Sequence, residues 1–342
     1  MRTILDPELE RPVEEVAGTY PDDAVALERY PALRYFKARL GGTSLLEVPG
    51  PDGGAPILAK CEFENPTGSV KDRVAYALLC RAIAEHTGPE QLKLLDYSGG
   101  SLVRAFGQLR RVTGIPMRFA VPSSIPQTWL RQIVASGLEV DLVPVEYGIA
   151  GIVARAFEIA AEDRSWTLMH QMRNEANVGV HELTTGAEIV AQLGGRVPTH
   201  WVASVGTGGT LAGVARALRT INPGLAVFTN TPGEMPYGTQ EQPNGLPKFA
   251  GSGGLGGGVR QPFVATFADD AEHRSTGYGS TLEAMCRFEK LTGLRIGTSA
   301  AANWSVAWET AAGLGPGHLV VTVFPDGGAV EEWERAYEHT AS

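Results

Sequence analysis

Cysteine is scarce in this sequence. Only Cys61, Cys80 and Cys286 occur among 342 residues, and they lie far apart along the chain. Three isolated cysteines form neither a disulfide framework nor a Cys-x-x-Cys pair for a metal or a redox reaction. They are typical of a protein that works in a reducing compartment, and we therefore expect a cytoplasmic protein.

Long apolar runs and a secretory leader are missing as well. The longest uncharged stretch near the end of the sequence, residues 311–325, is interrupted by glycines, Pro316 and His318, so it is too broken to span a bilayer. Residues 1–10 alternate charged and apolar side chains and lack the basic region and apolar block of a secretory signal. We expect no membrane as a partner.

Basic residues are fewer than acidic residues in this sequence. The chain has 29 Lys and Arg residues against 38 Asp and Glu residues, a formal net charge of -9, and no run of basic residues. Such a chain repels the phosphate backbone of a nucleic acid. We therefore expect no nucleic acid as a partner.

Glycine, in contrast, is abundant. An average share of about 7% would give about 24 glycines in a chain of this length. This sequence has 42, without a collagen-like period or a long Gly/Ser tract. With 43% hydrophobic and 20% charged residues the composition is that of a globular protein, and the length predicts about two domains. The surplus of glycine is expected in loops with a function.

Short β-rich runs alternate with helical patterns along most of the chain. The expected strands are residues 57–63, 92–97, 117–121, 140–143, 201–205, 226–228 and 319–324. Apolar spacing predicts helices around residues 102–112 and 211–218. This alternation is typical of βαβ units with parallel sheets. We expect two α/β domains, residues 1–150 and 151–342, and an N-terminal arm, residues 1–23, that crosses to the other domain.

One segment breaks the alternation. Residues 231–262 are rich in proline and glycine and have little periodicity. A long loop of this kind inside a compact protein predicts a function, and a plain solvent-exposed loop is the alternative.

The clearest chemical signal follows the strand expected at residues 201–205. It is the run Gly206, Thr207, Gly208, Gly209 and Thr210, directly before a helix. Glycines let the backbone approach a ligand closely, and the N–H groups and dipole of a helix N-terminus attract an anion. The run predicts an anion-binding cup, with a tight turn that binds nothing as the alternative.

Other ligand and catalytic motifs are missing. The cup does not have the spacing G-x-G-x-x-G, no acidic residue stands near Phe228, and the chain has no G-x-x-x-x-G-K-[ST]. There is no G-x-S-x-G motif, and His181-Glu182 lacks the second histidine of a zincin helix. A nucleotide therefore fits poorly, and we expect no metal site.

A second segment combines a lysine with a helix N-terminus. Lys71 stands in Asn-Pro-Thr-Gly-Ser-Val-Lys-Asp-Arg, residues 65–73, which follows an expected strand and opens a helix. The helix dipole disfavours an ammonium there, so the amine is more easily neutral and nucleophilic. By itself such a lysine is more often a surface residue. Together with an anion cup it predicts a phosphorylated cofactor that carries an aldehyde.

These motifs resemble the cysteine synthase and cystathionine β-synthase group of fold type II pyridoxal phosphate enzymes. The resemblance runs from about residue 42 to residue 324. Residues 65–73 match N-P-x-x-S-V-K-x-R, residues 206–210 match G-T-G-G-T, and residues 181–189 match H-E-x-T-T-G-x-E-I. The resemblance implies doubly wound three-layer α/β domains with mostly parallel sheets, as in the tryptophan synthase β chain, and a homodimer.

The resemblance also implies roles for residues around pyridoxal 5'-phosphate. Lys71 would form the Schiff base, and residues 206–210 would bind the phosphate. The run 297–301 resembles the family's G-x-S-[SA]-G, which implies that Ser299 meets the pyridine nitrogen. A hydroxyl there does not hold the nitrogen protonated, which favours β-elimination over transamination. A helix N-cap is the alternative role for Ser299, and Asp326 is the second candidate for contact with the ring.

The substrate loop departs from the family. The implied substrate-binding residues are Tyr97, Ser98, Gly99, Gly100, Ser101 and Gln171. In the family motif T-S-G-N-T-G an asparagine stands at the place of Gly100, so its side-chain amide is absent here and the loop has room for something bulkier. Backbone N–H groups and serine hydroxyls can still bind a carboxylate. Arg173 and Arg260 are candidates for a second carboxylate, with a solvated surface arginine as the alternative.

The resemblance implies β-elimination or β-replacement on a serine- or cysteine-derived amino acid through an aminoacrylate. Lys71 would also remove the α-proton. A cysteine synthase-like enzyme with a specialised, biosynthetic substrate is the first hypothesis, and a lyase that releases pyruvate and ammonia is the second. A catalytically silent homologue that keeps the cofactor, or a nucleotide-binding α/β enzyme, would be alternatives of other classes.

Overall fold

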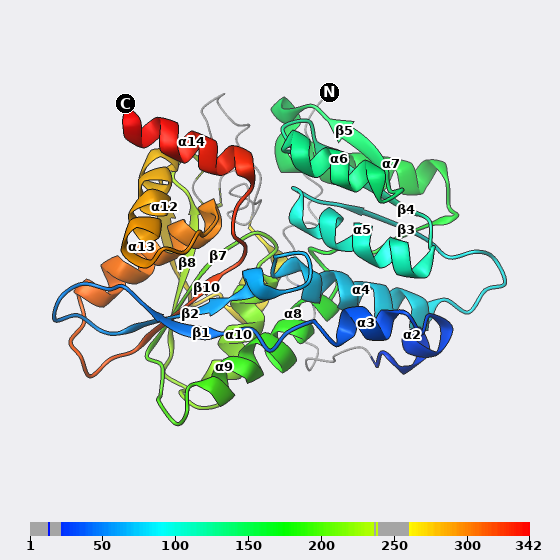
Figure 1. Ribbon diagram of the computed structural model, residues 1–342. Helices are drawn as coiled ribbons and strands as arrows, with labels where there is room; N and C mark the ends of the chain where they lie inside the picture. Colours follow the sequence, from blue (N-terminus) through cyan, green and yellow to red (C-terminus); the bar gives the residue numbers. More distant parts are fainter. Residues whose placement is uncertain (1–12, 14–21, 236, 239–259) are drawn as a thin grey trace.

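Two β-sheets organise the protein in a computed structural model that describes residues 13, 22–235, 237–238 and 260–342 (Figure 1). The smaller sheet has the order β5-β4-β3-β6, and all of its pairs are parallel. Its strands are β3 (Lys93–Tyr97), β4 (Met117–Pro122), β5 (Glu139–Val143) and β6 (Trp166–Leu168).

The larger sheet has the order β1-β2-β10-β7-β8-β9. Its strands are β1 (Leu45–Val48), β2 (Ile57–Cys61), β7 (His200–Ser204), β8 (Ala226–Pro232), β9 (Glu272–Thr276) and β10 (Val320–Phe324). β1 pairs with β2 in the antiparallel sense, and the other pairs of this sheet are parallel. The expected mostly parallel sheets are confirmed.

Helices cover both faces of the smaller sheet. One face packs against α4 (Lys71–Glu85), α5 (Ser101–Thr113) and α6 (Gln127–Ala135), and the short helices α2 (Ala24–Arg29) and α3 (Leu33–Lys37) extend this layer. The other face packs against α7 (Gly148–Glu162). Phe119 and Ala120, neighbours on β4, belong to these two different cores, as the alternation of side chains along a strand requires.

Helices also cover both faces of the larger sheet. One layer is α12 (Tyr278–Thr292), α13 (Thr298–Ala312) and α14 (Val330–Ala341), and the other is α9 (Ala187–Gln192), α10 (Gly209–Arg219) and α11 (Pro262–Phe267). Every residue of β10 is buried, because Val320 and Phe324 pack into one layer and Val321 and Val323 into the other. The expected three-layer α/β architecture is confirmed.

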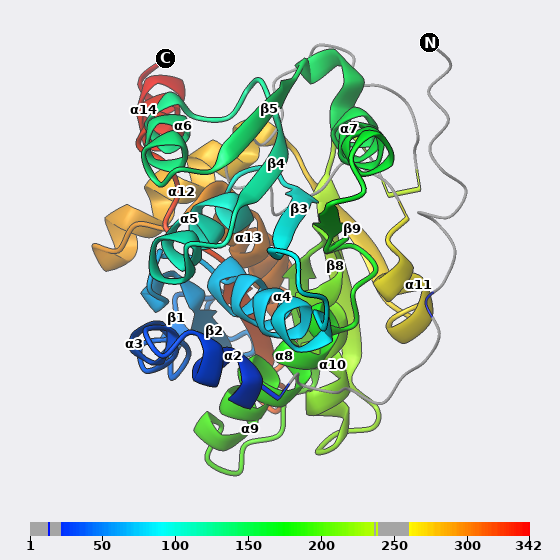
Figure 2. The same ribbon diagram turned by 90° about the vertical axis from the view of Figure 1, so that its right-hand side faces the viewer.

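The short helix α8 (Ala176–Val180) lies between the two parts of the molecule. It contacts α4 of the smaller-sheet part and α10 of the larger-sheet part. Figure 1 shows α8 between these two helices, and Figure 2 shows the three helices close together. The π-helical turn His181–Gly186 continues from α8 into α9. The remaining elements are two 3-10 turns, Glu62–Glu64 and Val145–Tyr147.

The two sheets do not follow a division of the chain at residue 150. β1 and β2 lie in the larger sheet with strands from the second half of the chain, whereas β6, after residue 150, lies in the smaller sheet. Alternation along a sequence indicates that a strand exists, but its hydrogen-bond partner depends on the path of the chain in space.

All seven expected strands are present, but β1, β6 and β9 were not predicted. Each of the three lies at the edge of a sheet. Their burial is incomplete, so they lack the continuous apolar run that predicted the central strands.

Other expectations fall partly outside the described residues. Of the expected arm, residues 1–23, the structure describes Val13, Asp22 and Asp23. The N–H of Val13 donates to Thr266 Oγ1 at 3.0 Å, and its side chain packs with Phe263 and Phe267 of α11. Most of the glycine-rich segment, residues 239–259, lies outside the described residues. Of the helices that the structure describes, none is both long and apolar enough to cross a membrane.

Candidate active site

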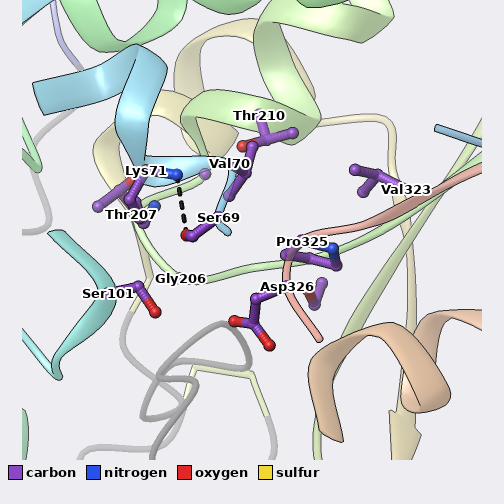
Figure 3. A pocket seen from close by; sticks show the side chains of 12 residues that line it. Ser69, Val70, Lys71, Ser101, Gly206, Thr207, Thr210, Val323, Pro325 and Asp326 are labelled. Atoms are coloured by element: carbon purple, nitrogen blue, oxygen red, sulfur yellow. Dashed lines mark hydrogen bonds between the residues drawn. The ribbon is translucent and has the colours of Figure 1, made fainter. Parts of the chain in front are cut away.

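Three neighbouring strands of the larger sheet lead into one pocket. The order β2-β10-β7 places the carboxyl ends of these parallel strands side by side, and the segments after them carry Lys71, Asp326 and Gly206. Ligand sites of α/β proteins usually lie at this edge of the sheet. The described residues that line the pocket are Ser69, Val70, Lys71, Ser101, Ser204, Gly206, Thr207, Gly208, Thr210, Val323, Pro325 and Asp326 (Figure 3).

Lys71 is the first residue of α4, and it lines the pocket. Its backbone N–H donates to Ser69 Oγ at 3.1 Å, the dashed line in Figure 3. Burial lowers the pKa of Lys71 to about 8, and the negative charge of Asp326 opposes this shift. More of the amine is therefore neutral near neutral pH than for a solvated lysine, which suits a nucleophile.

A buried cluster of charges holds the start of α4. Arg73 is only 1% exposed, and it pairs with Glu62 and with Glu188 at 2.7 Å each. Glu188 also pairs with the buried Lys60 at 2.7 Å. Two positive and two negative side chains thus compensate one another inside the protein, as buried charges require. Since Glu62 follows β2 and Glu188 belongs to α9, the cluster fixes the helix that begins with Lys71 to both elements.

The turn of residues 206–210 has the geometry of an anion cup. Gly208 has a φ of +86°, which glycine adopts without strain, and α10 begins at Gly209. A Cβ atom on Gly209 would lie 2.2 Å from Asn177 Oδ1, so the close approach of α8 requires glycine. Asn177 Nδ2 also donates to Thr207 Oγ1 at 3.0 Å. The N–H of Gly209 donates to Thr207 Oγ1 at 3.3 Å, and the next N–H groups in the first turn of α10 are placed to bind an anion.

His181 supports the same turn, a role that was not predicted from the sequence. Its ring nitrogens lie 3.1 Å from Thr210 Oγ1 and 3.0 Å from Thr185 Oγ1. Burial lowers the pKa of His181 well below its ordinary value, and the positive charges of Lys71 and Arg73 lower it further. The neutral ring therefore offers one donor and one acceptor to the two hydroxyls. The motif of residues 181–189 was visible in the sequence, but this contact depends on how α10 packs.

The predicted substrate loop joins β3 to α5. Gly100 is buried with a φ of +147° and a ψ of -60°, a conformation that strains any other residue. Its N–H donates to Ser98 Oγ at 3.1 Å. Within the described part of the chain, Ser101 is the one residue of this loop that lines the pocket, and its buried Oγ has no hydrogen-bond partner there. A buried hydroxyl without a partner at this place suits a ligand.

Tyr97 and Gln171 lie outside the described pocket lining. Gln171 Nε2 donates to the carbonyl oxygen of Tyr97, and the Tyr97 hydroxyl lies 2.7 Å from His170 Nδ1. His170 has a φ of +55°, which is uncommon for a residue other than glycine. These contacts hold the segment around Gln171 against the start of the substrate loop.

Asp96 hydrogen-bonds to both segments that meet at this contact, through the N–H groups of Tyr97 and Gln171. It is fully buried, and its carboxylate accepts the N–H of Tyr97 at 2.9 Å and that of Gln171 at 3.3 Å. Burial raises the pKa of Asp96 to about 8, although both N–H groups lower it. This residue does not stand out in the sequence, because an aspartate at the end of a strand is ordinary there and becomes unusual only when it is fully buried.

The two candidates for ring contact differ in position. Asp326 lines the pocket, and its Oδ1 accepts the N–H of Gly328 at 3.0 Å. Burial raises the pKa of Asp326 to about 6. Ser299 is fully buried in the first turn of α13, outside the described lining. A Cβ atom on Gly297 would lie 2.1 Å from Asp326 Oδ1, so the turn before Ser299 packs directly against the carboxylate.

The two arginines considered for a second carboxylate lie elsewhere. Arg260 is exposed and Arg173 is half-buried, and the described pocket lining includes neither.

The family is decided by comparison with known proteins. A family model described as pyridoxal-phosphate dependent enzyme matches residues 37–326, which include the whole described pocket lining. The chain belongs to this family. Cysteine synthase from Staphylococcus aureus (strain Mu50 / ATCC 700699) is 31% identical over 291 residues, which are 84% of this chain and 92% of that protein. Cysteine synthase B from Escherichia coli (strain K12) is 35% identical over 182 residues, 53% of this chain and 59% of that protein.

Solved structures of similar enzymes have the same fold. An O-acetylserine dependent cystathionine beta-synthase from Helicobacter pylori has a TM-score of 0.76 and 26% identity, with 85% of this chain and 94% of that chain covered. A mutant of O-ureido-L-serine synthase has a TM-score of 0.79 and 23% identity, with 88% and 92% covered, and shows the fold alone. The protein is a cysteine synthase-like, pyridoxal-phosphate dependent enzyme that acts on an amino acid.

The pocket of this pyridoxal-phosphate dependent enzyme fits its cofactor. The cup of residues 206–210 offers N–H groups and two threonine hydroxyls, and it contains no carboxylate that would repel a phosphate. Lys71 lies in the same pocket with an amine of lowered pKa. The buried Ser101 Oγ, without a partner in the described structure, adds a free donor on the substrate-loop side.

Proposed function

We propose that this enzyme catalyses β-replacement on a serine- or cysteine-derived amino acid: a group on the β-carbon leaves before a nucleophile adds. One observation carries the proposal. Lys71, an amine of lowered pKa, and the anion cup of residues 206–210 share one pocket, although they lie far apart in the sequence. A cofactor with an aldehyde and a phosphate needs both groups at once.

When bound, pyridoxal 5'-phosphate supplies an aldehyde for an amine and a ring that withdraws electrons from the α-carbon of the substrate. In our proposal Lys71 Nζ would hold the aldehyde, the cup of residues 206–210 would hold the phosphate, and Ser299 would meet the ring nitrogen. The amine of Lys71, once it is free, would remove the α-proton of the substrate.

The loop of residues 97–101 is proposed to take the α-carboxylate of the substrate. Its support is the buried hydroxyl of Ser101, which has no partner among the described residues and lines the pocket at the N-terminus of α5. Gln171 would position this loop without contacting the carboxylate, because its side-chain amide donates a hydrogen bond to the carbonyl oxygen of Tyr97.

The relatives favour replacement over a lyase reaction. Two of them are named cysteine synthases, and a solved structure with the same fold is named an O-acetylserine dependent cystathionine beta-synthase. The absence of an asparagine at Gly100 supports a substrate that differs from that of the common cysteine synthases.

The test is a spectral titration of the purified, cofactor-loaded protein with β-substituted alanines, followed by addition of sulfide or another nucleophile. A change of the visible cofactor band with a donor, reversed by the nucleophile together with a new amino acid, would support replacement. Pyruvate and ammonia without a nucleophile would support the lyase reaction instead. No spectral change with any donor would contradict both.

The homodimer that the family resemblance implies also belongs to this proposal. Light scattering during size-exclusion chromatography should give twice the mass of one chain, and a monomer would contradict it.

A further inference from the structure

A half-buried arginine lies beside the pocket without a carboxylate partner among the described residues. Arg104 belongs to the first turn of α5, three residues after Ser101, which lines the pocket. One of its N–H groups donates to the carbonyl oxygen of Thr67 at 3.2 Å. Thr67 stands two residues before Ser69, which also lines the pocket. The guanidinium therefore lies between the substrate loop and the segment that leads to Lys71, next to the described pocket lining without being part of it.

The packing around Arg104 orients its guanidinium. Its Cζ lies 4.5 Å from the centre of the Trp129 ring, and Trp129 is itself buried. An arginine over an aromatic ring has its planar group held in place while its N–H edges stay open to an acceptor. A flexible surface arginine would not be held on two sides in this way.

The nearby carboxylates are engaged elsewhere. Asp72 accepts the N–H and the hydroxyl of Thr67, at 2.7 and 2.5 Å. Asp326 accepts the N–H of Gly328. Both attract Arg104, but in the described part of the chain neither forms an ion pair with it. Arg73, in contrast, has two carboxylate partners.

A positive charge that is partly removed from water and has no paired anion costs free energy, which a bound anion recovers. We propose that Arg104 binds an anionic group of the substrates other than the α-carboxylate. This inference rests on the proposed function and narrows its substrate class: either the leaving group on the β-carbon or the incoming nucleophile carries a carboxylate or a phosphate.

Two pairs of substrates distinguish an anionic leaving group from an anionic nucleophile. For the leaving group, O-phospho-L-serine is compared with O-acetyl-L-serine as the donor. For the nucleophile, mercaptoacetate is compared with the neutral 2-mercaptoethanol. The proteins are the wild type, Arg104→Gln, Arg104→Lys and the control Arg111→Gln, which changes an exposed arginine on the same helix.

The wild type should prefer the anionic member of one pair. In Arg104→Gln, kcat/KM for that member should fall by about 10- to 100-fold, the loss of a hydrogen-bonded charge pair, while the neutral member changes less than about twofold. Arg104→Lys should lie between, because a lysine keeps the charge but not the paired N–H groups. Arg111→Gln should behave as the wild type. Equal losses for both members of each pair would overturn the inference.

A binding measurement distinguishes failure of the inference from failure of the proposed reaction. Calorimetry with the cofactor-loaded protein measures the Kd of O-phospho-L-serine and of mercaptoacetate, without turnover. If no donor reacts but Arg104→Gln still weakens the binding of one anion about 10-fold or more, the proposed reaction is wrong and the anion site stands. If donors react but neither anion depends on Arg104, the anion site is wrong and the reaction stands.

Discussion

The cup at residues 206–210 and the proposed substrate loop at residues 97–101 have the same place between a strand and a helix, but they differ in their glycine conformations. Each follows a parallel strand and opens a helix, α10 or α5. The cup keeps the family's motif unchanged, and the φ of Gly208 is common for glycine in turns. The loop has Gly100 in a conformation that only glycine tolerates well. The proposed cofactor side thus keeps the family's motif, whereas the proposed substrate side departs from it at Gly100.

The supports behind the two turns differ as well. Asn177 and His181 contact threonines of the cup through neutral hydrogen bonds. Behind the loop lie the buried Asp96, whose pKa burial raises to about 8, and His170 with its uncommon backbone. Changes on the cofactor side should therefore affect all substrates, whereas changes on the substrate side should affect the stability of the loop and the choice of substrate.

The largest effect is expected for Lys71→Ala on the cofactor side. If Lys71 holds the cofactor and moves the α-proton as proposed, its loss should lower turnover by about 1000-fold or more. The visible band of the lysine-bound cofactor should also be lost. Absorption spectra and initial rates check this, with the exposed Lys290→Ala as the control. Retention of both band and rate would show that another residue carries the role.

Gly209→Ala should come next. The new Cβ would lie 2.2 Å from Asn177 Oδ1, so α8 or the cup has to move. Such overpacking costs about 1–3 kcal/mol, which corresponds to roughly 10- to 100-fold weaker cofactor binding if the strain falls on the cup. Equilibrium titration with pyridoxal 5'-phosphate measures it. Gly315→Ala, where nothing lies within 4 Å, is the control. Equal affinities for the two variants would contradict the role of this contact.

Gly100→Asn tests the substrate side by introducing the family's residue. At a φ of +147° an asparagine should destabilise the fold by about 1–3 kcal/mol, or force the loop into another conformation. Urea unfolding of the cofactor-free protein measures the change. The control is Gly114→Asn at the other end of α5, where φ is +68°, a value that asparagine tolerates. Unchanged stability together with unchanged substrate preference would show that Gly100 has no part in selectivity.

The smallest effect on turnover is expected for Asp96→Asn, whose consequence lies in the pH dependence of the free energy of unfolding. Burial raises the pKa of Asp96 from 3.8 to about 8, so between these pH values the folded protein binds a proton that the unfolded chain has released. The free energy of unfolding should therefore fall as the pH rises through this window. Asp96→Asn should make the free energy of unfolding depend less on pH, whereas a change of the exposed Asp52, Asp52→Asn, should leave this dependence as in the wild type. Urea unfolding at about pH 5 and about pH 8.5, on the two sides of the folded-state pKa, gives the comparison. Parallel pH profiles for all three proteins would contradict a buried, protonated Asp96.

The local patterns of the proposed cofactor side could be recognised in the sequence. The run of residues 206–210 and the lysine at a helix N-terminus are local patterns, and each depends on one strand and the helix after it. The substrate side was harder to recognise. The sequence did not indicate that Tyr97 and Gln171, which are expected to bind substrate, also take part in contacts between the loop and the segment around His170. Arg104 stood in the sequence as one more charged residue of an amphipathic helix, because the lack of a carboxylate partner among the described residues is a property of its surroundings.

The sequence by itself determined the alternation of strands and helices, the central strands, and the local patterns that contain Lys71 and the cup, because these depend on residues close together in the chain. The tertiary structure decided which strands share a sheet, since β2, β10 and β7 come from distant parts of the chain. Their order brings Lys71, Asp326 and the cup to one edge. Burial, which shifts the pKa values of Lys71 and Asp96, exists only once these elements have packed together.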